Sequence, residues 1–369
     1  MRIVLLYRSL DQGGVQRMMV SLANYLVAHD IDVTILLLRK EGEFIKIVDN
    51  KVNIESFKTD TYLSLLPQLV KKLKQGKYDL LFTATPSLNV VAIIASLIVK
   101  VKVVISERSD PLKEFIGTRF GFYKLAYAFI PLLYRYADEI VCVSQGVANS
   151  LVKMAMISKS RIQVIYNPAY NPNSKLQVDE QVEHPWLLNK TIPVIISAGR
   201  LAKQKNFTLL INAFCILQQR RPLRLIILGE GPDESELKKL VEKLGITSSV
   251  DFVGFKINPI AWISKADVFV LSSLWEGFGN ILIDALASRT TIVSTDCKSG
   301  PSEILDGGTY GYLLSDFTPL NMATYIEKAL DAPFNKELLL SRASMFSTNI
   351  IMRDYEKVFG LSFESPRNR

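Results

Sequence analysis

The sequence predicts an α/β protein of two doubly wound, Rossmann-like domains that face each other across a cleft. Its length of 369 residues is typical of two domains. Short β-branched runs alternate with longer amphipathic stretches, which is the rhythm of βαβ units around a parallel sheet. This rhythm breaks between Ile162 and Pro193, where Asn-Pro steps and a polar stretch cluster, so a domain linker is expected there.

The first domain is expected over residues 1–170, and its elements follow from the alternation of β-branched and amphipathic segments. The expected strands are Arg2–Tyr7, Asp32–Leu38, Leu80–Thr83, Val101–Ser106 and Glu139–Val143. The expected helices are Val15–Ala28, Leu63–Lys74, about Gly117–Tyr136, and one that opens at Ser144-Gln145-Gly146.

After a linker at 171–192, the same rhythm predicts a second domain over residues 193–347. Its expected strands are Pro193–Ser197, Leu223–Leu228, Val250–Phe252, Val268–Leu271 and Thr291–Ser294. Its expected helices are Asn206–Gln219, Asp233–Leu244, Pro259–Ser264 and Asn280–Ala287. The tail from about Asn321 is expected to be helical to about Phe359, and a C-terminal helix at about 348–369 is expected to join the first domain.

Composition and charge narrow the class of protein. With 49% hydrophobic and 22% charged residues, the chain is typical of a soluble globular protein. Residues 1–170 hold 22 basic and 14 acidic side chains, whereas residues 171–369 hold 22 of each. A basic first domain suggests an acidic partner, either nucleic acid or an anionic membrane surface; scattered solubilising lysines are the alternative.

Targeting and metal-binding signals are missing from the sequence. The apolar run after Met1 is too short for a secretory signal, and the longest apolar stretch, Val90–Val99, is half of what a bilayer requires. We therefore expect a cytoplasmic protein. Cys142, Cys215 and Cys297 lie far apart and indicate neither a disulfide framework nor a metal site.

Two loops after expected strands carry residues suited to phosphate. Gly13 and Gly14 follow the first strand and precede a helix, where free backbone N–H groups favour a phosphate, although a plain tight turn would look the same. In the second domain Arg200 and Lys205 follow a strand within one short loop. A planar guanidinium and a compact ammonium suit a diphosphate; two solvated loop charges are the alternative.

The segment from Trp275 to Ala287 is the most informative of the chain. Its two glycines allow close backbone approach, and the helix from about Asn280 directs its N-terminal amides toward the same place. Glu276 can accept hydrogen bonds from sugar hydroxyls, and Asp284 could reach ribose hydroxyls. Phosphate-binding amides beside hydroxyl-binding carboxylates indicate a nucleotide sugar; a helix cap and a surface Asp are the alternative.

Taken together, these residues resemble the family 4-type retaining glycosyltransferases of GT-B fold. The resemblance covers about residues 1–360 and is carried by motifs that occur in the family's order. These are Gly13-Gly14, the Gly199–Asn206 segment, Gly-Glu-Gly-Pro at 229–232, Val253-Gly254, the Glu276–Asp284 segment, and Ser294–Glu303, which is similar to bacterial polysaccharide-building members.

The resemblance implies roles for these residues. Arg200 and Lys205 would hold the donor diphosphate, Glu276 the sugar hydroxyls, and Asp284 the ribose, while Gly14 would close on the phosphate from the other domain. The catalytic residues would be Glu276, Arg200 and Lys205. The remaining donor-binding positions would be Gly13, the base-side residues Val253, Gly254 and Phe255, and the sugar and phosphate cradle Gly277, Phe278, Gly279, Asn280 and Ile281. Asp284 departs from the family's second Glu by one methylene, which could weaken or shift the ribose contact.

The acceptor side departs from the family pattern too. Some relatives carry a His after the fourth strand, where this chain has Glu107, Arg108 and Asp110. These three are acceptor-side candidates, and a plain loop is the alternative. Both His29 and His184 are interpreted as structural. The resemblance implies front-face attack, in which the departing phosphate itself draws the acceptor proton.

No metal or other cofactor is expected. The string Asp30-Ile31-Asp32 matches the Asp-x-Asp of metal-dependent transferases, but it precedes a strand and so lies at the wrong end of the sheet for a ligand. Arg200, Lys205 and the helix dipole can replace the ion.

The first domain is expected to meet an anionic membrane surface. Cations and aromatics interleave over some 24 residues, and Lys71, Lys72, Lys74 and Lys77 form a second basic cluster. The interleaved residues are Lys113, Arg119, Phe120, Phe122, Tyr123, Lys124, Tyr127, Phe129, Tyr134, Arg135 and Tyr136. Nucleic-acid binding would use similar chemistry, and a core helix with a solvated face is the plain alternative.

The expected function is retaining, metal-independent transfer of a hexose or N-acetylhexosamine from a nucleotide sugar, with UDP favoured over GDP, to a lipid-linked saccharide acceptor. This places the enzyme in cell-surface polysaccharide, lipopolysaccharide or O-antigen synthesis, on the inner face of the cytoplasmic membrane, with no nucleic-acid partner. The alternatives are a catalytically silent donor-binding subunit and a hydrolase-like or epimerising enzyme on the same fold.

Overall fold

The computed structural model describes the chain except for residues 12, 58, 60, 118–121, 171–179 and 362–369. It divides into two compact units. Unit 1 comprises Met1–Pro168 together with Thr348–Arg369, and unit 2 comprises Ala169–Ser347. The division falls just before the expected linker at 171–192; residues 180–192 belong to unit 2, and 171–179 lie outside the described residues.

Unit 1 contains a parallel sheet of seven described strands in the order β3-β2-β1-β4-β5-β6-β7. The chain runs outward from β1 and returns to the other side of β1 at β4, which is the doubly wound arrangement. The strands are β1 (Arg2–Tyr7), β2 (Asp32–Leu37), β3 (Asn53–Ser56), β4 (Leu80–Thr83), β5 (Lys102–Glu107), β6 (Glu139–Cys142) and β7 (Ile162–Val164). Because helices cover both faces, these strands are mostly apolar and buried, as in β1 and β4.

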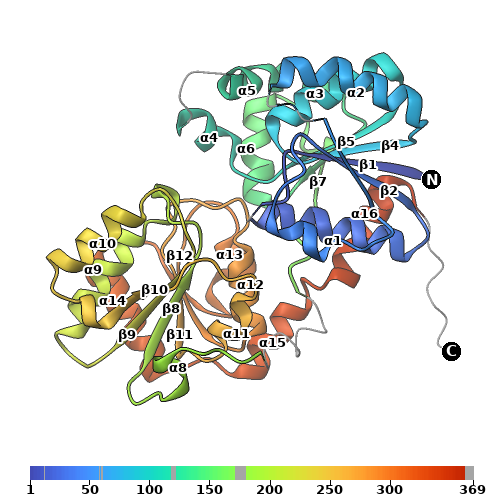
Figure 1. The fold of residues 1–369 in the computed structure, drawn as a ribbon. Helices are drawn as coiled ribbons and strands as arrows, with labels where there is room; N and C mark the ends of the chain where they lie inside the picture. The colour runs from blue at the N-terminus through green and yellow to red at the C-terminus, as the bar shows by residue number, and fades with distance from the viewer. Residues whose placement is uncertain (12, 58, 60, 118–121, 171–179, 362–369) are drawn as a thin grey trace. The chain divides into compact units, whose positions relative to one another are not determined.

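Two groups of helices cover the sheet of unit 1. On one face α2, α3 and α5 lie side by side, and α1 lies with α16 on the other (Figure 1). The helices are α1 (Gly14–Ala28), α2 (Tyr62–Gly76), α3 (Pro86–Val99), α4 (Pro111–Gly117), α5 (Phe122–Leu133), α6 (Gln145–Ala155) and α16 (Thr348–Phe359). Short 3₁₀ turns are η1 (Glu43–Ile47), η2 (Tyr134–Tyr136) and η3 (Lys159–Arg161).

Unit 2 contains a second parallel sheet of six described strands in the order β10-β9-β8-β11-β12-β13. The strands are β8 (Val194–Ala198), β9 (Arg224–Leu228), β10 (Val250–Phe252), β11 (Val268–Leu271), β12 (Thr291–Thr295) and β13 (Tyr312–Leu314). The helices are α8 (Pro185–Leu188), α9 (Phe207–Gln218), α10 (Glu234–Lys243), α11 (Pro259–Ile263), α12 (Asn280–Ala287), α13 (Pro301–Ile304), α14 (Pro319–Asp331) and α15 (Lys336–Ser344), with 3₁₀ turns η5 (Lys203–Lys205), η6 (Thr247–Ser249) and η7 (Asp306–Gly308).

The core of unit 2 lies between its sheet and two long helices. Ile195, Leu225 and Val270 from three strands pack with Phe214 of α9 and Ile326 of α14. All five side chains are fully buried, and each such side chain contributes about 1.5–3 kcal/mol of transfer free energy. This packed layer holds the ends of the strands, and the loops that follow them, in fixed places.

The fold class predicted from the sequence is confirmed, but several elements differ. The sequence pattern does not predict helix α3, which contains the apolar stretch Val90–Val99, because a helix that is apolar almost all round has no polar face to reveal its period. The helix expected over Gly117–Tyr136 is α4, α5 and η2, with residues 118–121 outside the described chain. The helical tail is three helices, because Pro333 follows the end of α14 and α16 starts anew at Thr348 in unit 1. None of the described helices combines the length and apolarity that a membrane span requires.

Candidate active site

The predicted donor residues of unit 2 gather at the carboxyl ends of β8 and β11. These two strands are neighbours, and the chain leaves β8 toward β9 on one side and returns at β11 on the other. This is the topological switch point, where open α/β sheets bind their ligands. The loop after β8 carries Arg200 and Lys205, and the loop after β11 carries Glu276.

Lys205 and Glu276 form the central contact of the site. The Lys205 Nζ atom lies 2.5 Å from Glu276 Oε1, and the two side chains are only 17% and 7% exposed. The hydroxyl of Ser273 donates to the same carboxylate oxygen at 2.6 Å. A charge pair with so little water around it costs free energy to desolvate, and one partner alone would be strongly unfavourable. The pair therefore fixes a cation and a hydrogen-bond acceptor together at the switch point.

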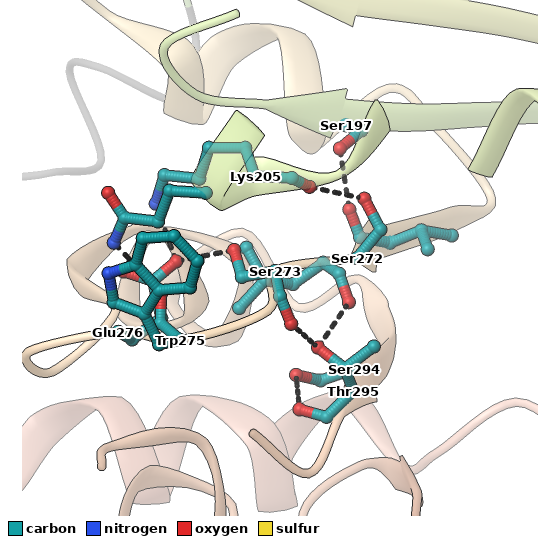
Figure 2. A network of polar contacts seen from close by, with 11 residues as sticks. Ser197, Lys205, Ser272, Ser273, Trp275, Glu276, Ser294 and Thr295 are labelled. Carbon is teal, nitrogen blue, oxygen red and sulfur yellow. Dashed lines mark hydrogen bonds and ion pairs between the residues drawn. The ribbon is translucent and has the colours of Figure 1, made fainter. Parts of the chain in front are cut away.

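Hydroxyl groups anchor the backbone around this pair, as Figure 2 shows. Ser272 Oγ donates to the Lys205 carbonyl at 2.8 Å, and Thr295 Oγ1 donates to the Ser273 carbonyl at 2.7 Å. Deeper in the sheet, Ser197 Oγ donates to the Val270 carbonyl at 2.6 Å. These bonds join the ends of β8, β11 and β12, so the loops that carry Lys205 and Glu276 are held to one another.

Two further contacts hold the loop around Trp275. Gln204 accepts from the Leu274 N–H through its carbonyl, and its side chain donates to the Trp275 carbonyl, both at 2.8 Å. On the other side, the Glu276 N–H donates to the Lys298 carbonyl at 3.3 Å. The Trp275-Glu276 step is therefore clamped between the loop after β8 and the loop after β12.

The N-terminus of α12 follows directly from this loop. Gly279 caps the helix with φ of 98°, in the left-handed region that a residue with a Cβ rarely adopts. Gly300 has no room for a side chain, since a Cβ there would lie 1.8 Å from the Phe278 carbonyl oxygen. The segment Gly277–Ile281 thus turns sharply into the helix, whose first N–H groups and dipole favour a negative ligand.

The other predicted donor residues lie around this centre with different degrees of exposure. Arg200 is exposed and forms no ion pair or side-chain hydrogen bond within the described part of the chain. Val253, Gly254 and Phe255 follow β10 at the same edge of the sheet and are partly exposed. Asp284 is 2% exposed within α12, so its contact with ribose stays a prediction.

Sequence reasoning assigned no role to Glu230, which the structure places at this edge. Its Oε1 atom accepts from the Phe255 N–H at 3.4 Å, and a Cβ on Gly254 would contact the same oxygen. Glu230 is exposed and lies two residues beyond the end of the buried strand β9. Its position after a strand was the signal that could have identified it.

No metal-binding cluster of His, Cys, Asp or Glu occurs among the residues that the structure describes. Asp30 is a left-handed turn residue before β2, and the Asp32 carboxylate is 2.8 Å from Arg2 Nε, at the amino end of the sheet. Cys297 lies near the donor loops, but burial raises the pKa of its thiol to about 12, so it is a neutral packing residue.

In unit 1, Gly13 caps α1 and Gly14 is its first residue, as the phosphate prediction requires, and their ligand stays a prediction. The acceptor-side candidates Glu107, Arg108 and Asp110 are buried in unit 1, and their contact with an acceptor stays a prediction. Asp110 is 1% exposed, and its carboxylate accepts from the first N–H groups of α4 and from Ser150. Arg108 is buried and donates to Asn167 Oδ1 at 2.9 Å and to the Tyr355 hydroxyl.

Glu107 is fully buried at the end of β5. Its Oε1 atom accepts from Asn89 Nδ2 at 2.9 Å and from the Tyr134 hydroxyl, whereas its Oε2 atom has no hydrogen-bond partner in the described structure. Burial raises the pKa of this carboxyl to about 7, and the bonds from Tyr134 and Asn89 oppose the rise only in part. Its hydrogen bonds connect the end of β5 with Asn89 of α3 and Tyr134 of η2.

Two doubly wound α/β units, one with a cation and carboxylate pair beside a helix N-terminus at its switch point, define the GT-B class of glycosyltransferases. Comparison with known families agrees. The model of "Glycosyltransferase Family 4" matches residues 12–169, and that of "Glycosyl transferases group 1" matches residues 179–345. The chain belongs to this family and is a glycosyltransferase.

Curated relatives and solved structures extend this comparison. A Campylobacter jejuni N-acetylgalactosamine-N,N'-diacetylbacillosaminyl-diphospho-undecaprenol 4-alpha-N-acetylgalactosaminyltransferase is 34% identical over 69% of this chain and 68% of its own. A second C. jejuni enzyme, an alpha-1,4-N-acetyl-D-galactosaminyltransferase acting on a diNAcBac-PP-undecaprenol-linked saccharide, is 26% identical over 92% of each chain. Anabaena HepE in complex with UDP-glucose superposes with a TM-score of 0.81 at 20% identity, covering 98% of this chain and 99% of that one.

Proposed function

We propose that this glycosyltransferase moves a hexose or N-acetylhexosamine from a UDP-sugar to a lipid-linked saccharide, with retention of anomeric configuration and without a metal ion. The observation that carries the proposal is the Lys205–Glu276 pair, buried at the switch point beside Arg200 and the N-terminus of α12. This arrangement offers positive charge for a diphosphate and a carboxylate for sugar hydroxyls in one place.

Arg200 and Lys205 would neutralise the two phosphates of the donor. The Arg200 guanidinium, exposed and without an ion pair in the described chain, can form two parallel bonds to phosphate oxygens. Lys205 supplies a compact charge whose position Glu276 fixes at 2.5 Å. The N-terminal amides of α12 add a third source of positive potential, so departure of the nucleoside diphosphate needs no divalent ion.

Retention would follow from attack on the same face from which the nucleotide leaves. The acceptor oxygen approaches the anomeric carbon, the bond to the phosphate oxygen breaks, and the departing phosphate takes the acceptor proton. No protein base is required on this route. Catalysis on this route comes from positioning and from stabilising the leaving group.

The relatives support the substrates of the proposal. The names of both C. jejuni enzymes refer to a saccharide linked to undecaprenol diphosphate, and the HepE structure is a complex with UDP-glucose. By analogy we infer a polyprenyl-linked or similar lipid-linked saccharide as acceptor, in the synthesis of a cell-surface polysaccharide or lipopolysaccharide. An enzyme with such an acceptor works at the inner face of the cytoplasmic membrane.

A thermal-shift series tests donor binding. The purified protein is melted with UDP, GDP and ADP and with UDP- and GDP-sugars, each with and without EDTA. A nucleotide at 100 times its dissociation constant adds about 2.7 kcal/mol of stability. We expect UDP to raise the melting temperature regardless of EDTA, and the Arg200→Ala variant to lose most of the shift. Folded protein that responds to no nucleotide would contradict the proposal.

Product analysis separates the proposal from its rivals. NMR of the product formed on a lipid-linked acceptor should show the same anomeric configuration as the donor. Without acceptor, an epimerase would release a free epimer and a transferase would not. A catalytically silent subunit would bind UDP but transfer nothing, and its Glu276→Gln variant would leave the activity of any complex unchanged.

A further inference from the structure

The loop that follows β9 is fixed between the loops that follow β8 and β10. The Leu201 N–H donates to the Glu230 carbonyl at 2.9 Å, and the Gly229 N–H donates to the Gly254 carbonyl at 2.8 Å. Gly229 has φ of 127°, and a Cβ there would lie 2.0 Å from the Gly199 carbonyl oxygen. The backbone of Glu230 is therefore bonded to both neighbouring loops and has one position.

The side chain of Glu230 is held much less firmly than its backbone. One carboxylate oxygen accepts from the Phe255 N–H at 3.4 Å, which is longer than the usual distance of about 2.9–3.0 Å for such a bond. Glu230 is exposed, and no Lys or Arg forms an ion pair with it among the residues that the structure describes. Because water competes for such a contact, a ligand can replace it with little loss of free energy. One N–H donor and one charged acceptor then lie next to each other at the edge of the sheet.

This donor and acceptor lie where the nucleoside of the sugar donor would extend. The side chains proposed to bind the diphosphate, Arg200 and Lys205, follow β8, and Glu276, proposed to bind the sugar, follows β11. The nucleoside is at the other end of the diphosphate from the sugar, so it points toward β9 and β10, which come next to β8 on its other side. Because adjacent strands are about 4.8 Å apart, Glu230 and Phe255 lie roughly 5–10 Å along the edge from the end of β8. A ribose spans such a distance between its phosphate and its base.

The chemistry of the pair fits one edge of uracil. Uracil presents the N3–H, which donates a hydrogen bond, beside the O4 carbonyl, which accepts one. Glu230 can accept from the N3–H while the Phe255 N–H donates to O4, so a single position of the ring satisfies both groups. The bond from N3–H to the carboxylate is charge-assisted and is therefore the stronger of the two.

The same pair disfavours cytosine and adenine. In the ring position of uracil, cytosine presents the lone pair of N3 to the carboxylate of Glu230 and an amino group to the Phe255 N–H. Acceptor would then face acceptor and donor would face donor, and the N1 and amino group of adenine repeat this pattern. A site built to bond one pattern rejects an analogue that leaves its polar groups unpaired. Guanine has an N–H beside a carbonyl as uracil does, so the pair excludes cytosine and adenine but not guanine.

We propose that Glu230 is a base-specificity residue, which accepts a hydrogen bond from the N3–H of uracil while the Phe255 N–H donates to O4. This inference rests on the proposed function, which supplies the uridine diphosphate of the donor. Because Glu230 contacts the base and not the reacting atoms, its loss raises the Kd of UDP and the KM of the donor. The rate at saturating donor stays near that of the wild type.

The experiment is calorimetric titration of the full chain with UDP, CDP, GDP and N3-methyl-UDP, in which a methyl group replaces the N3–H. The test variants are Glu230→Ala and Glu230→Gln. The matched control is Glu242→Ala, at an exposed acidic position of α10 in the same unit. The Gln side chain keeps the size of Glu and adds an amide N–H that can donate to N3 of cytosine. Urea unfolding establishes that every variant is folded.

We expect the wild type to bind UDP about tenfold more tightly than CDP or N3-methyl-UDP, because both lack the N3–H. Glu230→Ala should weaken UDP about tenfold and bind UDP and N3-methyl-UDP alike, since the acceptor is gone. Glu230→Gln should bring the affinities for UDP and CDP close together. A side chain that only braces the loop would change the affinities for all nucleotides by the same factor. Glu242→Ala should bind every nucleotide as the wild type does.

The outcomes separate this inference from the proposed function. Equal wild-type affinity for UDP and N3-methyl-UDP, or an unchanged ratio of UDP to CDP affinity in Glu230→Gln, would overturn the role of Glu230 and leave UDP binding intact. Tighter binding of GDP than of UDP would overturn the assignment of uracil. A folded wild type that binds none of the nucleotides would contradict the proposed function and this inference together.

Discussion

Lys205 and Glu276 stabilise each other. Single and double variants can therefore separate their contribution to stability from their contribution to catalysis. Lys205→Met leaves a carboxylate that is 7% exposed without its cation, so we expect a loss of about 3–5 kcal/mol in unfolding free energy. Transfer should fall about 10²–10³-fold, because a group that stabilises the departing diphosphate is removed. Urea unfolding and initial transfer rates measure the two effects.

The double variant Lys205→Met/Glu276→Gln gives the contrast. It removes both charges while keeping side chains of similar size, so most of the stability should return while transfer stays low. If transfer returned with stability, the pair would be structural and the proposed donor site would be wrong. If stability did not return, the buried charge would not explain the single variant.

Glu107 predicts a pH dependence of stability. Its folded pKa of about 7 lies above its usual value of 4.5 because burial disfavours the charged form. Its folded state therefore binds the proton more tightly than the unfolded state does, so stability is full below pH 4.5 and declines as the pH rises to about 7. The total loss is about 3 kcal/mol.

Glu107→Gln keeps a neutral group of the same shape and should remove this decline. Above pH 7 the variant should unfold at higher urea concentration than the wild type, and near pH 4.5 the two should be similar. Glu139→Gln, on the neighbouring strand and bonded to Gln163 near the surface, is the control and should keep the wild-type slope. Parallel slopes for Glu107→Gln and the wild type would show that Glu107 is charged in the folded protein.

The same residues show what sequence can predict of a site. Arg200, Lys205 and Glu276 were identifiable because each lies just after a buried strand, and parallel strands bring such loops to one edge. The 2.5 Å contact between Lys205 and Glu276, 71 residues apart, depends on loop conformations that no local pattern specifies. Glu107 looked like a loop residue because burial of a carboxyl by Asn89 and Tyr134 is decided by tertiary packing.

At the scale of elements, the N-terminus of α12 depends on one left-handed residue. Gly279→Ala should cost about 1–2 kcal/mol of stability, because φ of 98° is strained for a residue with a Cβ. The same strain should shift the first amides of α12 and weaken UDP binding severalfold. Gly245→Ala is the matched control, since Gly245 has φ of 70° and open space around it, just beyond α10.

Both variants should lose stability in urea, but only Gly279→Ala should lose UDP affinity in a titration. Equal UDP affinity in the two would mean that the amides of α12 do not contact the donor. An unstrained Gly279→Ala, with wild-type stability, would contradict the left-handed turn itself.

A helix or strand could be predicted from the sequence where its apolar residues stand out against polar ones. The strands β1, β4 and β11 have the expected bounds, or nearly so, because short apolar runs stand out between polar loops. The edge strands β3, β7 and β13 were not identified, since most of their side chains are half-buried or exposed and their pairing comes from the sheet. The apolar helix α3 was missed for the opposite reason, because it lacks a polar face.

The described end of the chain belongs to the unit that contains its beginning. Helix α16 buries Met352, Tyr355 and Phe359 in unit 1, where the Tyr355 and Phe359 rings contact Phe82 of β4 and the Tyr355 hydroxyl accepts from Arg108. Removing it would expose an apolar face of the sheet and leave the Arg108 guanidinium without one of its acceptors.

A chain that ends at Ser347 should therefore keep unit 2 folded and lose much of the stability of unit 1. Differential scanning calorimetry should show one transition near its wild-type temperature, which UDP still raises, and a second that is lowered by tens of degrees or absent. A chain that ends at Leu361 retains all of α16 and should melt as the full chain does. If both truncations melted alike, the packing of α16 would not support unit 1. If removal of α16 instead abolished the UDP response, donor binding would depend on unit 1 and would not be a property of the switch point of unit 2 alone.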